Sequence, residues 1–90
     1  MAQAIVDPAE LRRFANNLKR FNTELEERMT SLAAQLHALG ASWRDQENKK
    51  FVEEFEQQMK AIARYVDITN EHAPFLLRKA ERIEEYLQQR

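Results

Sequence analysis

The chain has 90 residues, of which 43% are hydrophobic and 32% charged, and its formal net charge is −1. Acidic and basic residues are interleaved, so the chain has no basic face for nucleic acid, and binding to anionic membrane surfaces is disfavoured. The absence of cysteine excludes disulfides, thiol chemistry and cysteine-ligated zinc. One Gly and two Pro favour helix throughout, and the length is that of one small all-α domain, residues 1–90.

Nothing in the sequence indicates a segment that targets or spans a membrane. No apolar run approaches the length needed to cross a bilayer. The start of the chain, Met1 to Val6, is too short for a secretory signal peptide and lacks its basic region. We therefore expect a cytoplasmic protein without membrane insertion, whose secretion would not depend on a signal peptide.

A first helix is predicted over residues 8–39. Asp7 followed by Pro8 is a strong helix start, because Asp caps free N–H groups and Pro is well tolerated at the first helical position. From there, large apolar residues recur at steps of three and four, which is typical of paired amphipathic helices. These residues are Leu11, Phe14, Leu18, Phe21, Leu25, Met29, Leu32, Leu36 and Leu39.

The only glycine of the chain marks a turn. Gly40 is expected to close the first helix in the left-handed conformation that glycine adopts without strain. Ser42, with Asp45 three residues later, has the spacing of a capping box, which predicts that a second helix follows a turn at 40–42. The second helix is then expected to span about 43–88.

The second helix contains Pro74. The apolar residues keep their steps of three and four on both sides of it, which favours one long helix bent at the proline. In the alternative, the helix ends near Glu71 and a third helix from Pro74 folds back over the hairpin. The apolar positions are Phe51, Phe55, Met59, Ile62, Val66, Thr69, Ala73, Leu76, Ala80, Ile83 and Leu87.

The expected antiparallel hairpin leaves apolar surface uncovered. Two equal helices joined at 40–42 would end together near Pro74, so the apolar residues beyond it would have no cover. Two helices also cannot shield a wide apolar stripe on both of them, whereas two hairpins can form a four-helix bundle. We therefore expect dimerisation, with the same chain or with a similar hairpin. The predicted interface residues are Phe14, Leu18, Phe21, Phe51, Phe55, Met59, Phe75, Leu76, Ile83 and Leu87.

A helical hairpin of this size with a tryptophan at its turn resembles the WXG family, the small early-secreted-antigen-like hairpins handled by type VII secretion. Trp43-Arg44-Asp45 stands where the family has Trp-x-Gly, and Gly40 lies before the tryptophan instead. An acidic residue in this place suits the first turn of a helix, because it interacts favourably with the helix dipole. The turn motif therefore consists of Gly40, Trp43 and Asp45.

The family's C-terminal export signal, Tyr-x-x-x-Asp/Glu, is missing. The fourth residue after Tyr65 is Thr69, and the fourth after Tyr86 is Arg90. Related hairpins work as pairs in which one member bears the signal, so the resemblance implies a partner that supplies it. For Trp43, the residues predict a large side chain that fills the turn end of the helical pair, and the resemblance adds a role in docking a partner.

The sequence offers no converging catalytic or metal-binding set. His37 is expected near the turn and His72 near the opposite end of the hairpin, and neither has Glu three residues before it as ferritin-like sites require. No glycine-rich loop, Ser–His–Asp set or Cys–His set is present. We expect no enzymatic activity, no metal and no cofactor.

The favoured hypothesis is a non-enzymatic protein-protein interaction module. In this hypothesis it acts as a type VII-like secretion substrate or as a chaperone-like partner of a larger secreted effector. The alternative is an intracellular adaptor or structural subunit of a larger complex that is not exported.

Overall fold

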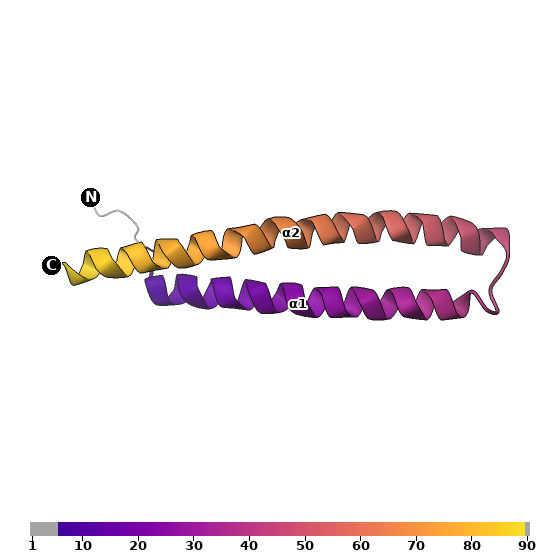
Figure 1. Ribbon diagram of the computed structural model, residues 1–90, viewed down its shortest axis with the longest axis horizontal. Helices are drawn as coiled ribbons and strands as arrows, with labels where there is room; N and C mark the ends of the chain where they lie inside the picture. Colours follow the sequence, from indigo (N-terminus) through magenta and orange to yellow (C-terminus); the bar gives the residue numbers. More distant parts are fainter. Residues whose placement is uncertain (1–5, 90) are drawn as a thin grey trace.

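The computed structural model describes residues 6–89. In this range the chain forms two helices and no strand: α1 spans Pro8–Leu39 and α2 spans Gln46–Gln88. The helices lie antiparallel and side by side, joined by a turn at 40–45 (Figure 1). The molecule is a rod with extents of 68 × 22 × 17 Å. The all-α helical hairpin expected from the sequence is confirmed.

Both helices begin with an aspartate cap. The Asp7 carboxylate accepts a hydrogen bond from the backbone N–H of Ala9 at 2.9 Å. The Asp45 carboxylate accepts one from the backbone N–H of Asn48 at 3.1 Å. A side-chain oxygen in this position satisfies one of the free N–H groups of the first helical turn. Each helix therefore starts where an aspartate can supply this oxygen.

The turn is longer than the sequence indicated. The Ser42 hydroxyl donates to the Leu39 carbonyl at 3.3 Å instead of capping α2, and the backbone N–H of Trp43 bonds to the same carbonyl at 2.9 Å. Gly40 has φ −61° and ψ −17°, so the predicted left-handed conformation was wrong. The predicted start of the second helix at residue 43 was also wrong, because local hydrogen bonds to α1 hold the chain in a turn as far as Trp43. The helix begins at Gln46.

α2 continues without interruption through Pro74. The proline has no N–H to donate to the Asn70 carbonyl, which weakens the helix at this point. Ala73, next to it, is only 1% exposed, so packing against α1 holds the helix together here. Figure 1 shows α2 bending toward α1 in this orange region. The bent helix is confirmed, and the alternative third helix was wrong.

The contact line between α1 and α2, here called the seam, differs from the predicted one on α1. Phe14 and Phe21 were expected to lie in it, but they are 57% and 51% exposed. Their neighbours Ala15 and Asn22 are buried instead, because small side chains allow the two backbones to approach closely whereas two phenylalanines would hold them apart. The fully buried seam residues are Ala15, Asn22, Val66, Ala73 and Ala80.

α1 also covers more of α2 than expected. Ala80 is fully buried, and Arg12 near the start of α1 forms an ion pair with Glu84. The expectation that the pairing ends near Pro74 was therefore wrong. It assumed a tight turn at 40–42, whereas the turn at 40–45 lets α2 begin beyond the end of α1. Only the last part of α2 projects past the start of α1 (Figure 1).

The hairpin is extended for its mass. Its radius of gyration is 20.3 Å, whereas a compact chain of this length has about 12 Å. Its accessible surface is 7623 Å², against about 5,500 Å² for a typical folded monomer of the same mass. The surplus of surface is largely a consequence of having only two helices to bury each other.

Candidate interaction surface

The large exposed apolar residues lie mainly on one side of the seam. Phe14 directly precedes buried Ala15, and Tyr65 directly precedes buried Val66. Successive helical residues are rotated by about 100°, and because the two helices are antiparallel, the residue before a seam residue points to the same side of the hairpin on both. We call this side the apolar face. Its residues are Phe14, Leu18, Phe21, Leu32 and Leu39 of α1 and Phe51, Tyr65, Phe75 and Leu76 of α2.

A shallow apolar recess lies on this face between the two helices. Its volume is about 390 Å³, and Phe14 and Leu18 of α1 meet Tyr65, Phe75 and Leu76 of α2 around it. The three aromatic side chains remain about half exposed, at 57%, 46% and 50% for Phe14, Tyr65 and Phe75. Thr69 and His72 are the polar residues of the lining. An exposed aromatic cluster of this kind is the usual centre of a protein interface.

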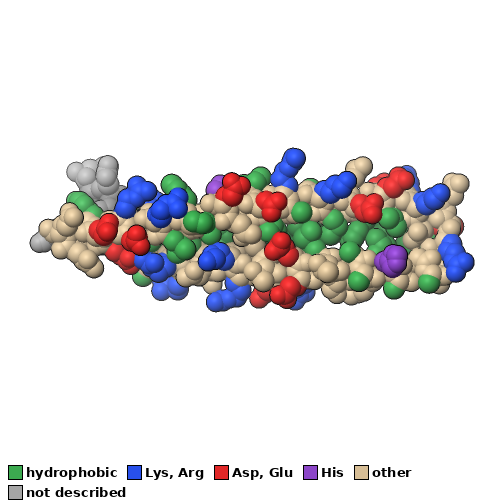
Figure 2. Space-filling view, in the orientation of Figure 1, with side chains coloured by type: hydrophobic (Ala, Val, Ile, Leu, Met, Phe, Trp, Pro, Cys, Tyr) green, Lys and Arg blue, Asp and Glu red, His purple; other side chains and the backbone are tan. Residues whose placement is uncertain are grey.

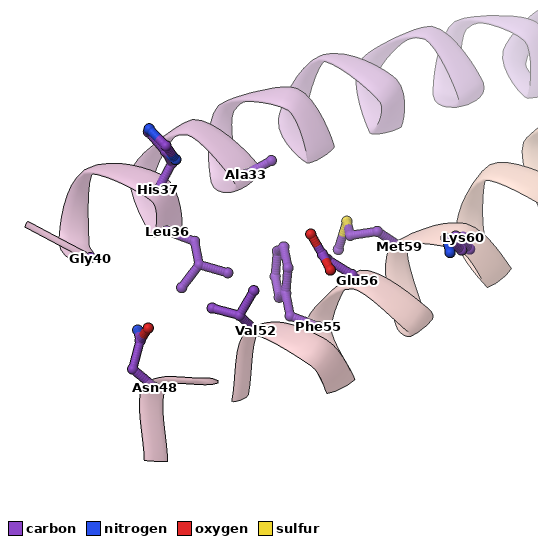
Figure 3. A pocket seen from close by; sticks show the side chains of 10 residues that line it. All are labelled: Ala33, Leu36, His37, Gly40, Asn48, Val52, Phe55, Glu56, Met59 and Lys60. Carbon is purple, nitrogen blue, oxygen red and sulfur yellow. The ribbon is translucent and has the colours of Figure 1, made fainter. Parts of the chain in front are cut away.

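A second apolar surface lies on the other side of the seam, near the turn. It is a groove of about 580 Å³ that Leu36 of α1 and Val52, Phe55 and Met59 of α2 line (Figure 3). Figure 2 looks onto this side and shows apolar side chains between the helices toward the turn end. The small residue Ala33 leaves room for the groove on α1. Phe55 and Met59, two of the predicted interface residues, therefore line this groove.

The turn end carries an aromatic row. The ring centroids of Trp43 and Phe51 are 5.9 Å apart at an interplanar angle of 40°, and those of Phe51 and Phe55 are 6.0 Å apart at 30°. Trp43 is half-buried, and the contact gives its ring a fixed apolar support. The three residues of the turn motif thus have separate places: Trp43 lies on Phe51, Gly40 lines the groove and Asp45 caps α2.

The structure separates the predicted interface residues into three groups. Five lie on the apolar face. Phe14, Leu18, Phe75 and Leu76 line its recess, and Phe21 is exposed on the same face outside the recess. Three lie toward the turn: Phe51, Phe55 and Met59. Ile83 is half-buried and Leu87 is 40% exposed at the projecting end of α2. The interface prediction omitted Tyr65, although its position directly before a seam valine is a signal that the sequence carries.

Two kinds of site are not found among the described residues: a cluster of metal ligands and a membrane-spanning helix. Between residues 6 and 89, no three His, Cys, Asp or Glu side chains lie close enough to hold a metal ion. Neither of the two helices has the length of apolar sequence that crossing a bilayer requires. His37 lines the groove near the turn, whereas His72 lines the recess on the apolar face, so the two histidines belong to different surfaces.

Comparison with known proteins supports the resemblance. The secreted protein EsxB from Bacillus anthracis str. Sterne, in its wild-type form, is 28% identical to this chain, covers 94% of it and 99% of its own length, and has a TM-score of 0.79. Two single-residue variants of EsxB, both 28% identical, give TM-scores of 0.76 and 0.79. The match to the first variant covers 93% of this chain and 97% of the variant's chain. The match to the second covers 94% of this chain and 96% of the variant's chain.

A search of curated proteins finds no match. The family model WXG100, described as proteins of 100 residues with WXG, matches residues 3–86. This match includes α1, the turn with Trp43 and α2 as far as residue 86, and the solved relatives share the fold over almost their whole length. The chain therefore belongs to the WXG100 family.

Proposed function

We propose that this protein is a non-enzymatic interaction module that pairs with a second copy of itself through the apolar face. In this proposal the pair is a four-helix bundle that serves as a type VII-like secretion substrate or as a chaperone-like partner of a larger effector. The observation that carries the proposal is the gathering of half-exposed aromatic residues on one side of a hairpin that belongs to the WXG100 family.

The amount of exposed surface supports pairing. The accessible surface of 7623 Å² exceeds that of a typical monomer of this mass by about 2,100 Å². A stable interface of standard size removes about 800 Å² from each partner, and obligate dimers remove more. One additional hairpin is therefore a partner of sufficient size to cover the apolar face.

The shape of the apolar face also suits a second hairpin. Its residues run along the whole rod, from Phe75 and Phe14 near the open end to Leu39 and Phe51 near the turn. A rod-shaped partner with the same repeat of apolar side chains can match this length, and two antiparallel helix pairs pack in the manner of an ordinary four-helix bundle. The same surface serves both copies, as a two-fold symmetric dimer requires.

The pairing is tested with Phe14→Ser combined with Phe21→Ser. Both side chains are more than half exposed in the hairpin, so their loss leaves the helix content of the monomer nearly unchanged and weakens the dimer at least 30-fold. Sedimentation equilibrium measures the dimer dissociation constant. Ala63→Ser is the control, because Ala63 is exposed and its position three residues before Val66 puts it on the other side of the seam from the apolar face. A parent chain that remains monomeric at high micromolar concentration contradicts the proposal.

Export is tested separately from pairing. The absence of Tyr-x-x-x-Asp/Glu in the sequence means that, in this proposal, a partner carries the signal. The protein is then expected in the culture supernatant of its native host only when the type VII ATPase is intact. Retention in the cells of both strains contradicts secretion and favours the alternative, an intracellular adaptor or structural subunit. Purification from the host with mass spectrometry identifies the larger partner in either case.

Trp43 is the proposed docking residue at the turn. Its ring lies on Phe51 and is only half-buried, so part of it is available to a partner. We expect Trp43→Ala to weaken binding of the larger partner more than its loss of stability explains. Trp43→Phe, which keeps a ring at this place, is the matched variant. Loss of binding in strict proportion to unfolding would leave Trp43 a purely structural role.

A further inference from the structure

A polar cluster lies among the fully buried residues of the seam between α1 and α2. Asn22 is 1% exposed, and its Nδ2 donates to Thr69 Oγ1 and to Asn70 Oδ1, both at 2.8 Å. The Thr69 hydroxyl in turn donates to the backbone carbonyl of Tyr65 at 2.9 Å. The other fully buried residues of the seam, one valine and three alanines, are all apolar. The cluster is thus the one place in the fully buried seam where the helices recognise each other by hydrogen bonds.

We infer that Asn22, with Thr69 and Asn70, selects the register in which α1 and α2 pair. This role goes beyond the proposed function, because it concerns the alignment of the two helices within the hairpin and requires no partner. It also affects the proposed interface, since the recess on the apolar face has its present lining only in the register that brings Phe14 beside Tyr65.

The apolar seam residues alone define the register poorly. They recur with the spacing of a heptad on both helices, so a slide of α2 by seven residues again sets apolar residues against apolar residues. A slide in one direction would place Asn22 against Leu76 and Leu77. A slide in the other direction would place it against Ile62 and Ala63. None of these four side chains can accept or donate a hydrogen bond.

A buried side-chain amide without hydrogen bonds is strongly unfavourable. The slipped registers therefore lose stability at Asn22 alone, whatever the apolar contacts gain. The slide that places Asn22 against Ile62 and Ala63 would shorten the connection between the helices, and the turn at 40–45 opposes it. The slide that places Asn22 against Leu76 and Leu77 only needs the helix ends near the turn to unwind into a longer connection. That slide would also bring the projecting end of α2 onto α1 (Figure 1). It is the slipped register that the polar cluster has to exclude.

The cluster is not needed for stability. Asn22 Oδ1 is buried and accepts no hydrogen bond from residues 6–89, and replacing a buried polar group together with its partner by apolar groups is often neutral or stabilising. The double variant Asn22→Leu with Thr69→Val replaces each polar side chain by an apolar one with the same number and branching of heavy atoms, and Leu is the larger side chain at position 22. We expect it to melt at or above the temperature of the parent chain while its register becomes mixed.

The register is measured by electron–electron distance spectroscopy between spin labels. The chain has no cysteine, so labels are attached through Lys19→Cys and Glu53→Cys, both at exposed positions far apart along the rod. The labelled protein is diluted in a large excess of unlabelled protein, which removes distances between copies. We expect one distance in the parent chain and a second, about 10 Å away from it, in the double variant, because seven residues of helix span that length.

Leu25→Met in the same labelled chain is the control, since it alters an apolar seam side chain without touching the cluster. It should keep the single distance of the parent. An unchanged single distance in the double variant would overturn the inference. If the double variant fails to fold, Asn22→Ala removes the hydrogen bonds without adding volume, and its distance distribution supports or overturns the inference in the same way.

Discussion

The two halves of the hairpin differ in how closely their helices approach. All the fully buried residues lie in the half away from the turn, where Ala15 and Asn22 face Val66, Ala73 and Ala80. The half near the turn has no fully buried residue among those described, and a groove of about 580 Å³ opens there between the helices. The contrast follows from side-chain size, because Ala at seam positions brings backbones together while larger residues such as Leu36 and Met59 hold them apart.

The difference indicates that the two halves hold the fold together in different ways. In the open-end half, stability depends on close packing, so added side-chain volume or a buried charge there is costly. In the turn half, stability depends more on the Asp45 cap and on aromatic contacts such as Trp43 with Phe51. Substitutions of the same kind should therefore have different effects in the two halves.

The largest expected effect comes from a charge in the closely packed half. Val66→Asp places a carboxylate at a position that is 0% exposed, which should lower the free energy of unfolding by more than about 4 kcal/mol and leave the chain largely unfolded. Val52→Asp is the matched change in the turn half. Its side chain is half-buried and borders the groove, so a loss of about 1–2 kcal/mol is expected. Urea unfolding followed by circular dichroism measures both, and equal losses would contradict the contrast.

A change from Ala to Leu should alter the free energy of unfolding with opposite signs in the two halves. Ala73→Leu inserts a large side chain where the seam has no space, and we expect a loss of about 1–3 kcal/mol from overpacking. Ala33→Leu adds the same atoms at the rim of the groove, where filling it should raise the free energy of unfolding by about 0.5–1.5 kcal/mol. Thermal unfolding of the two variants beside the parent gives the sign of each change. A stabilising Ala73→Leu would mean that the seam is less tightly packed than described.

Much of the fold could be predicted because its signals are local and repeated. Asp7 and Pro8 mark the start of α1 in the sequence and in the structure. The spacing of apolar residues on both sides of Pro74 predicts a continuous α2, and it also includes Val66, Ala73 and Ala80 in the contact line. On α2, therefore, periodicity alone identifies the fully buried residues that face α1, although it also includes Phe51, which lies on the apolar face, and Leu87 at the projecting end.

The α1 contact line and the register could not be obtained in the same way. Steps of three and four fit Phe14 and Phe21 as well as Ala15 and Asn22, because the apolar stripe is wide and hydrophobicity favours the larger residues. Close packing between the helices favours the smaller residues Ala15 and Asn22 at the contact line. The spacing of apolar residues in the sequence does not contain that information. The same choice determines which aromatic residues remain on the apolar face. The sequence therefore predicts several residues of the candidate site, such as Phe14 and Phe21, but not the side of the hairpin on which they lie.

A smaller effect is expected at the cap of α2. Asp45→Ala removes the oxygen that accepts from the Asn48 N–H, which should lower the free energy of unfolding by about 1 kcal/mol. Asp45→Asn keeps an oxygen there and should lose only a few tenths of that amount. Amide hydrogen exchange locates the effect, with faster exchange in the first turn of α2 and unchanged exchange around Val66. Acceleration throughout both helices would show that the turn half and the open-end half unfold as one unit.

The smallest expected effect belongs to the ion pair at the open end. Arg12 and Glu84 pair across the seam, but their side chains are 40% and 39% exposed, so water and salt screen the attraction. A double-mutant cycle with Arg12→Met and Glu84→Gln should give a coupling of about 0.5 kcal/mol in dilute buffer, falling toward zero in 1 M NaCl. A coupling several times larger that persists in salt would mean that the ion pair, rather than the alanine packing of the seam, holds this end of the hairpin closed.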